Sequence, residues 1–153
     1  MRSKGHAGLG LLLGSVVFLL YPGDVRDFYL WLWLTIFLGM ITWPDLDLRF
    51  ELQHRGFTHT LAGAVFFGFV GAAVFGLARL DYAVYGFLGG FGGTLAHILG
   101  DVFTYMRFRP LWPLSRREVG LGWFRASDER VNRFFAKLGS ACFTLVLVYR
   151  LVD

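Results

Sequence analysis

The apolar residues of this chain are gathered into long blocks, and the polar residues fall mainly between those blocks. An amphipathic helix of a soluble protein would instead show a narrower apolar stripe beside a polar face. Blocks of this kind predict helices that lie in lipid.

Five apolar segments are predicted to form helices, at about residues 7–21, 28–43, 60–80, 82–103 and 134–152. The segment 60–80 is long enough, at a rise of about 1.5 Å per residue, to cross a hydrocarbon layer about 30 Å thick. The first two segments are shorter, which leaves tilted or partial spanning open for them. The pattern predicts an all-α, polytopic transmembrane helix bundle of about five spans, with residues 1–153 forming a single integral membrane domain.

The polar stretches between the helices carry further signals. Residues 21–24 offer no small-x-small cleavage site, so we expect the first segment to be an uncleaved signal anchor. In the long stretch 105–133, residues 127–129 (Ser-Asp-Glu) have the pattern of a helix N-cap followed by an acidic first turn. Aromatic residues and arginines interleave in this stretch, which predicts either a loop on the membrane surface or a compact cytoplasmic cap. The interleaved residues are Trp112, Trp123, Phe124, Arg109, Arg116, Arg117 and Arg125.

Composition narrows the classes of function. Hydrophobic residues make up 56% of the chain and charged residues 17%, so most of its surroundings are expected to be lipid. The formal charge is a modest +4, and the basic residues lie between the apolar blocks and form no single basic stripe, which argues against nucleic acid as a partner. The single cysteine, Cys142, excludes an intramolecular disulfide and a thiolate zinc site. A metal bound to this chain would therefore use nitrogen and oxygen ligands.

Basic residues are unequally divided between the two sets of loops that alternate along a five-span chain. One set holds twelve Lys and Arg residues, and the other holds only Arg26, Arg79 and Arg150. Because short basic loops stay in the cytoplasm, this bias predicts that the N-terminus and residues 45–59 and 106–133 are cytoplasmic. The expected protein is a multi-pass protein of the cytoplasmic (inner) membrane with its C-terminus outside.

Candidate metal ligands gather on the same predicted cytoplasmic side. His97 and Asp101 are four residues apart in an otherwise apolar helix, so they share one helix face. Ionisable groups inside a membrane helix are costly and indicate a functional site. Single residues also have simpler explanations, since Asp45 would end a turn and Asp47 would pair with Arg49. Those explanations do not account for three separate helix ends that supply ligands to one face, so we predict a metal site there. Its ligands are His6, Asp45, Asp47, His54, His59, His97 and Asp101.

Several short motifs resemble a known family. PDLD at 44–47, HRGFTHT at 54–60, HILGD at 97–101 followed by Thr104, and LWPLS at 111–115 are similar in order and spacing to those of the YdjM-type, LexA-regulated, membrane-bound metal-dependent hydrolases. His6 matches the histidine near the N-terminus of that family. The resemblance covers most of the chain up to Ser115 and little of it from Arg116 onward. It implies a polytopic inner-membrane protein with a divalent-metal site.

The ligand chemistry suggests a reaction class. Seven His and Asp ligands exceed the four that one tetrahedral zinc requires, which leaves one ion or a two-metal centre with a bridging aspartate open. Zinc or manganese suits these donors better than copper(I) does. Such a centre at the cytoplasmic membrane face predicts hydrolysis of a phosphoester, either lipid-linked or soluble. The candidate catalytic residues are Asp47, Arg55 and Thr58.

The roles of three flanking residues stay open at this point. Arg55 would either hold a phosphate oxygen or face water and lipid headgroups. Thr58 and Thr104 would either hydrogen-bond metal ligands from behind or form ordinary capping and backbone bonds.

Two non-catalytic alternatives are a metal-binding membrane scaffold and a metal transporter. A transporter should carry polar residues near the midplane of several helices, but the middles of the second, third and fifth segments are apolar. A scaffold would leave the ligand cluster unexplained. We therefore expect a membrane-embedded metal-dependent hydrolase whose partner is membrane lipid.

Overall fold

The computed structural model describes residues 1–48 and 56–152, and the side chains of these residues except those of 46–48. Its described secondary structure is helical. The elements are α1 (Ser3–Leu20), α2 (Phe28–Met40), the 3-10 helices η1 (Trp43–Leu48) and η2 (Phe57–His59), α3 (Leu61–Ala78), α4 (Tyr82–Val102) and α5 (Glu129–Val152). The predicted all-α fold is therefore confirmed.

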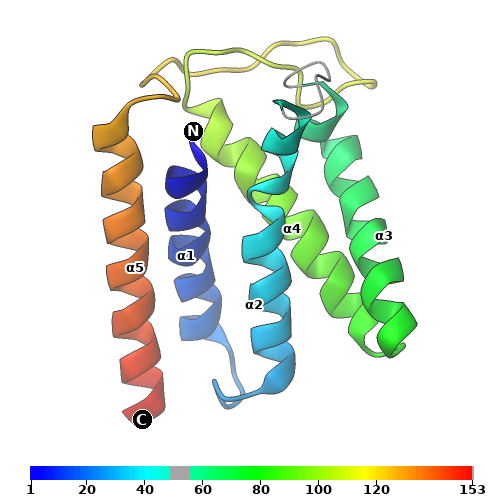
Figure 1. The fold of residues 1–153 in the computed structure, drawn as a ribbon, viewed down its shortest axis with the longest axis vertical. Coiled ribbons are helices and arrows are strands. Elements are labelled where there is room, and N and C mark those ends of the chain that lie inside the picture. The colour runs from blue at the N-terminus through cyan, green and yellow to red at the C-terminus, as the bar shows by residue number, and fades with distance from the viewer. Residues whose placement is uncertain (49–55, 153) are drawn as a thin grey trace.

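The five α-helices run alternately up and down, so that the two chain ends lie at opposite ends of the bundle (Figure 1). Helix α1 packs against α5, and α4 packs against both α2 and α3. The α1–α2 and α3–α4 connections consequently share one end, and α1 begins at the same end at which α4 finishes.

Four of the described helices, α1, α3, α4 and α5, are long and apolar enough to cross a membrane. Helix α2 has 13 residues, which rise about 20 Å against a hydrocarbon thickness of about 30 Å. It is shorter than the predicted segment 28–43 because the chain enters η1 at Trp43, next to Pro44, whose backbone cannot continue the hydrogen-bond ladder.

Helix α5 starts at Glu129, earlier than the apolar pattern alone predicts. Asp128 explains the early start, since its carboxylate accepts the backbone N–H of Arg130 at 2.9 Å. This is the N-cap expected from the Ser-Asp-Glu sequence.

Two helix pairs approach each other backbone to backbone through glycines. A Cβ at Gly139 of α5 would overlap the carbonyl oxygen of Gly8 in α1. In the same way, a Cβ at Gly71 of α3 would overlap the carbonyl oxygen of Gly86 in α4. Small residues at such contacts are how helices associate in lipid, where no hydrophobic force draws them together.

The outward surfaces of the bundle are apolar. Leu77 of α3 is 90% exposed and Leu145 of α5 is 70% exposed. In a soluble protein, helices this apolar on their outer faces would be liable to aggregate, whereas in a bilayer lipid covers them. The buried core lies between α1, α2 and α4, around Phe18, Leu34 and Phe37.

The segment 103–128 crosses the end of the bundle where α1 begins (Figure 1). Phe108 and Val119 exchange two backbone hydrogen bonds, and Pro110 accepts the backbone N–H of Leu61 at the start of α3. The inner side of the segment covers this end of the bundle, because the side chain of Phe108 is buried. On its outer side Leu114 is 91% exposed, so the predicted contact with the membrane surface stays a prediction.

Candidate metal centre

Within the described part of the chain, five side chains that can bind a metal converge at the capped end of the bundle. They come from four elements, α1, η1, η2 and α4, which are far apart in the sequence. Four of the five side chains are buried in the protein. The five residues are His6, Asp45, His59, His97 and Asp101.

Three of these side chains present donor atoms at separations that one ion can bridge. The Nε2 atoms of His59 and His97 are 3.1 Å apart. Oδ2 of Asp101 lies 3.6 Å from the Nε2 of His59 and 3.7 Å from the Nε2 of His97. Donors about 2.0–2.2 Å from a tetrahedral ion lie about 3.3–3.6 Å from one another. The three donors therefore fit one face of such a coordination shell with small adjustments.

Asp45 approaches the same two ring nitrogens from η1. Its Oδ1 atom is 3.5 Å from the Nε2 of His97 and 3.9 Å from the Nε2 of His59. The Asp45 side chain is 20% exposed, whereas both histidine side chains are fully buried. Asp45 is thus the described candidate ligand that lies nearest to solvent.

Hydrogen bonds at Nδ1 hold the rings of His59 and His97 so that Nε2 of each points into the cluster. Nδ1 of His97 lies 2.8 Å from the carbonyl oxygen of Ile41. A carbonyl only accepts, so Nδ1 carries the proton and Nε2 keeps its lone pair. Nδ1 of His59 lies 2.9 Å from Oγ1 of Thr58. An outer hydrogen bond of this kind usually supports a metal-bound histidine.

His6 is held in place by packing. Its ring stacks on that of His97, with centroids 3.8 Å apart, and its Nε2 lies 3.4 Å from Oδ1 of Asp101. Neither ring nitrogen of His6 meets hydrogen-bond geometry within the described residues, although both are buried. A buried polar atom left unsatisfied costs about 1–3 kcal/mol, and a metal ion at Nε2 would remove part of that cost. A Cβ at Gly100 would lie 3.0 Å from Nδ1 of His6, so glycine there gives the ring its space.

The carboxylate of Asp101 faces two sides of the cluster. Its Oδ1 contacts the amino group of Met1 and lies near His6, while its Oδ2 lies near His59 and His97. An aspartate between two ions has this divided orientation. His97 is shared by two groups of described donors, one with His59 and Asp101 and the other with His6 and Asp45. Its Nδ1 is bonded to Ile41, so that only Nε2 remains for a metal. A second ion would therefore need further ligands.

The structure does not place every candidate residue from the sequence. His54 and Arg55 lie outside the described residues, and Asp47 lies in η1 with its side chain outside them. Thr104 donates through Oγ1 to the backbone carbonyl of Asp101 at 2.8 Å, which is the backbone role considered for it. The Ile41 carbonyl and Gly100 were missed as parts of the site, because nothing in their local sequence connects them with His97 or His6.

The long helices with apolar outer faces define a multi-pass membrane protein. A cluster of potential metal ligands lies at one end of its bundle. The family described as YdjM inner membrane protein matches residues 1–152, so the chain belongs to that family. The match extends through the region after Ser115, in which the short motifs carry little resemblance. No curated protein and no solved structure matches the chain.

Proposed function

We propose that this protein is a membrane-embedded, metal-dependent hydrolase that acts on a phosphoester at the cytoplasmic face of the inner membrane. The observation that carries the proposal is the pair of Nε2 atoms of His59 and His97, 3.1 Å apart, each with its other ring nitrogen hydrogen-bonded from behind. Two imidazole Nε2 atoms directed at one point, beside a buried carboxylate, are the donor set of a divalent-metal site.

Zinc and manganese are the proposed metals, one or two ions per chain. Imidazole nitrogen suits zinc, and carboxylate oxygen suits manganese. Bound there, the ion would supply Lewis acidity for activating water and for polarising a phosphoryl oxygen.

The residues of the chain would bind the metal, orient its ligands and transfer protons. His59, His97 and Asp101 would hold the ion, and Thr58 would fix the ring of His59. Asp45, the most solvent-accessible of the five, stands where it would accept a proton from an attacking water. Asp47 and Arg55 are proposed from the sequence alone, as a further carboxylate and as the cation that holds a phosphate oxygen.

A phosphoester is the proposed substrate because of where the cluster lies. It sits at the end of helices that are long enough to span the hydrocarbon layer, which is the depth of lipid headgroups. The proposed cytoplasmic orientation rests on the unequal division of Lys and Arg. Lipid-linked and soluble phosphoesters would both reach this depth.

A non-catalytic metal site is the second candidate, and the burial of the histidines favours it. Structural metal sites are closed, whereas catalytic ones keep a position open for water or substrate. Among the described ligands only Asp45 reaches solvent. Transport is less well supported, since the buried hydroxyls of Ser15 and Thr94 bond to carbonyls of their own helices.

Hydrolysis by the purified protein tests the proposal. Wild type loaded with zinc or manganese should hydrolyse a chromogenic phosphodiester or a vesicle phospholipid, and Asp101→Asn should lose at least about a hundredfold in rate. Asp81→Asn is the matched control, because Asp81 is an exposed carboxylate at the opposite end of the bundle, paired with Arg79. Full metal content without hydrolysis of any phosphoester in a broad panel would instead assign the structural role.

A further inference from the structure

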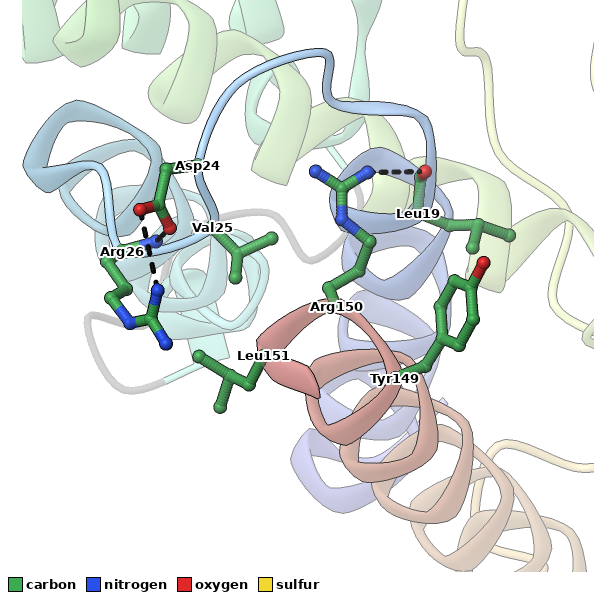
Figure 2. Close-up of a pocket in the computed structure, with 7 residues that line it drawn as sticks. All are labelled: Leu19, Asp24, Val25, Arg26, Tyr149, Arg150 and Leu151. Atoms are coloured by element: carbon green, nitrogen blue, oxygen red, sulfur yellow. Dashed lines mark hydrogen bonds and ion pairs between the residues drawn. The ribbon is translucent and has the colours of Figure 1, made fainter. Parts of the chain in front are cut away.

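A second candidate site lies at the opposite end of the bundle from the metal cluster. It is a cavity of about 450 Å³ between the end of α1, the α1–α2 connection and the end of α5 (Figure 2). The residues that line it are Leu19, Asp24, Val25, Arg26, Tyr149, Arg150 and Leu151.

Arg150 places a positive charge in this cavity. One of its terminal nitrogens donates to the carbonyl oxygen of Leu19 at 3.3 Å (Figure 2). The other donates to the carbonyl oxygen of Gly23 at 2.8 Å. Among the described residues no carboxylate pairs with Arg150. The end of α1 offers only the partial negative charge of a helix C-terminus, about half an elementary charge, so much of the guanidinium charge remains unmatched.

Arg26 adds a second positive charge. It lies 3.5 Å from the carboxylate of Asp24, and both side chains are more than half exposed. An exposed pair at this distance is weak and readily exchanged for another partner. Counted over the described lining residues, two arginines against one aspartate leave a surplus of one positive charge.

Among the residues that the structure describes, the charged groups outside the cavity at this end of the bundle are already engaged. Arg79 pairs with Asp81 at 3.0 Å, and Tyr29 donates to the same carboxylate at 2.6 Å. Tyr21 donates to Asp27 at 2.7 Å, and this hydrogen bond lowers the pKa of the Asp27 carboxyl. The surplus charge is therefore local to the cavity.

Apolar side chains stand beside the two arginines. Leu19 is 46% exposed and Leu151 is 41% exposed, and both lie at the ends of membrane-spanning helices. A ligand that fits has an anionic head for the guanidinium groups and an apolar tail for the leucines. Arginine matches the geometry of phosphate oxygens with paired N–H donors.

We propose that this cavity binds the phosphate group of a phospholipid in the leaflet opposite to the metal cluster. The volume is within the usual range for small-molecule sites, about 300–1,000 Å³. Bound lipid would join α1 to α5 at the end where, in the described residues, Arg150 makes the polar connection between them.

The test is lipid retention by the full-length protein in detergent, measured by native mass spectrometry with added phosphatidylglycerol. Wild type should retain one lipid, and Arg26→Gln should weaken its binding about 10- to 100-fold, the worth of one hydrogen bond to a charged group. Arg79→Gln is the matched control, since Arg79 is at the same end but outside the cavity, and it should bind like wild type. Arg150→Lys, which keeps the charge and loses the paired donors, should also weaken binding.

Two further measurements test whether binding requires the phosphate group and whether that phosphate comes from a lipid or from solution. Neutral diacylglycerol should bind at least about tenfold more weakly than phosphatidylglycerol; equal binding would overturn the proposal. Soluble glycerol phosphate is added as a competitor. If it displaces the lipid, the cavity binds phosphate groups in general. If the lipid stays bound, the phosphate that the cavity binds comes from membrane lipid. Equal retention of phosphatidylglycerol by wild type, Arg26→Gln and Arg150→Lys would also overturn it.

Discussion

The Nε2 atoms of His59 and His97 lie 3.1 Å apart although 38 positions separate the two residues in the sequence. Nε2 of His97 keeps its lone pair because Nδ1 donates to the Ile41 carbonyl. Nε2 of His59 donates a proton to that lone pair when the Thr58 hydroxyl donates to Nδ1 of His59, and the two lone pairs repel when that hydroxyl accepts instead. A proton or a cation between them would turn this repulsion into attraction. Asp101, whose Oδ2 is within 3.7 Å of both nitrogens, adds the negative charge that favours a divalent ion at that point.

The outer hydrogen bond to His59 predicts a selective effect on metal affinity. Thr58→Val removes the hydroxyl 2.9 Å from Nδ1 of His59 and should weaken metal binding about 10- to 100-fold. Thr60→Ala is the comparison, since Thr60 caps α3 through the backbone N–H of Gly63. It should cost about 1 kcal/mol of stability with little change in affinity. Metal titration and thermal unfolding would separate the two effects, and equal loss of affinity in both variants would contradict the assignment.

The contact between α1 and α5 predicts a stability difference between two glycines. Gly139→Ala would push a Cβ onto the carbonyl of Gly8 and should destabilise the protein by about 1–3 kcal/mol. Gly39→Ala meets nothing within 4 Å and should be neutral or stabilising by up to about 1 kcal/mol. Thermal unfolding in detergent would measure both changes. A Gly139→Ala protein as stable as wild type would mean that the two helices are further apart.

Membrane topology is predicted from the basic residues. The N-terminus should be cytoplasmic and the C-terminus outside, because twelve Lys and Arg residues fall in one set of loops and three in the other. Reporter fusions at the two ends should therefore report opposite compartments. If both ends reported the same compartment, the short helix α2 would be the one that does not cross.

The capping segment is predicted to touch lipid with its outer side. Trp112 is 44% exposed and Trp123 is 68% exposed, and arginines flank both in the sequence. Fluorescence of variants that keep only these two tryptophans should be quenched by lipid-bound quenchers. Fluorescence that lipid quenchers leave unchanged would show that the segment is a cap surrounded by water.

The sequence predicted the helices well because their apolar runs are long. It also predicted that His97 and Asp101 share a face, since four residues make about one helical turn. The apolar run places the last helix only from about residue 134, because its first turns are polar, whereas the Ser-Asp-Glu cap predicted at 127–129 gives the start that the structure shows.

The finer parts of both sites could not be predicted because they depend on tertiary contacts. The carbonyl of Ile41 that orients His97 lies 56 positions away, and the stacking of His6 on His97 joins α1 to α4. The cavity around Arg150 forms from carbonyls left free at the end of α1, and every helix leaves such carbonyls. Only packing selects the ones that meet a guanidinium group.

Metal content of the purified protein is the most direct test of the central claim, that these histidines and aspartates hold a divalent metal. Elemental analysis should find one or two zinc or manganese ions per wild-type chain, and less than about a tenth of that in His97→Ala, which loses a primary ligand. Thr94→Ala alters a buried polar residue of the same helix outside the cluster and should keep the wild-type content. Helical circular dichroism would confirm that both variants are folded. Wild-type metal content in folded His97→Ala protein, or no bound metal in the wild type after incubation with either ion, would contradict the claim.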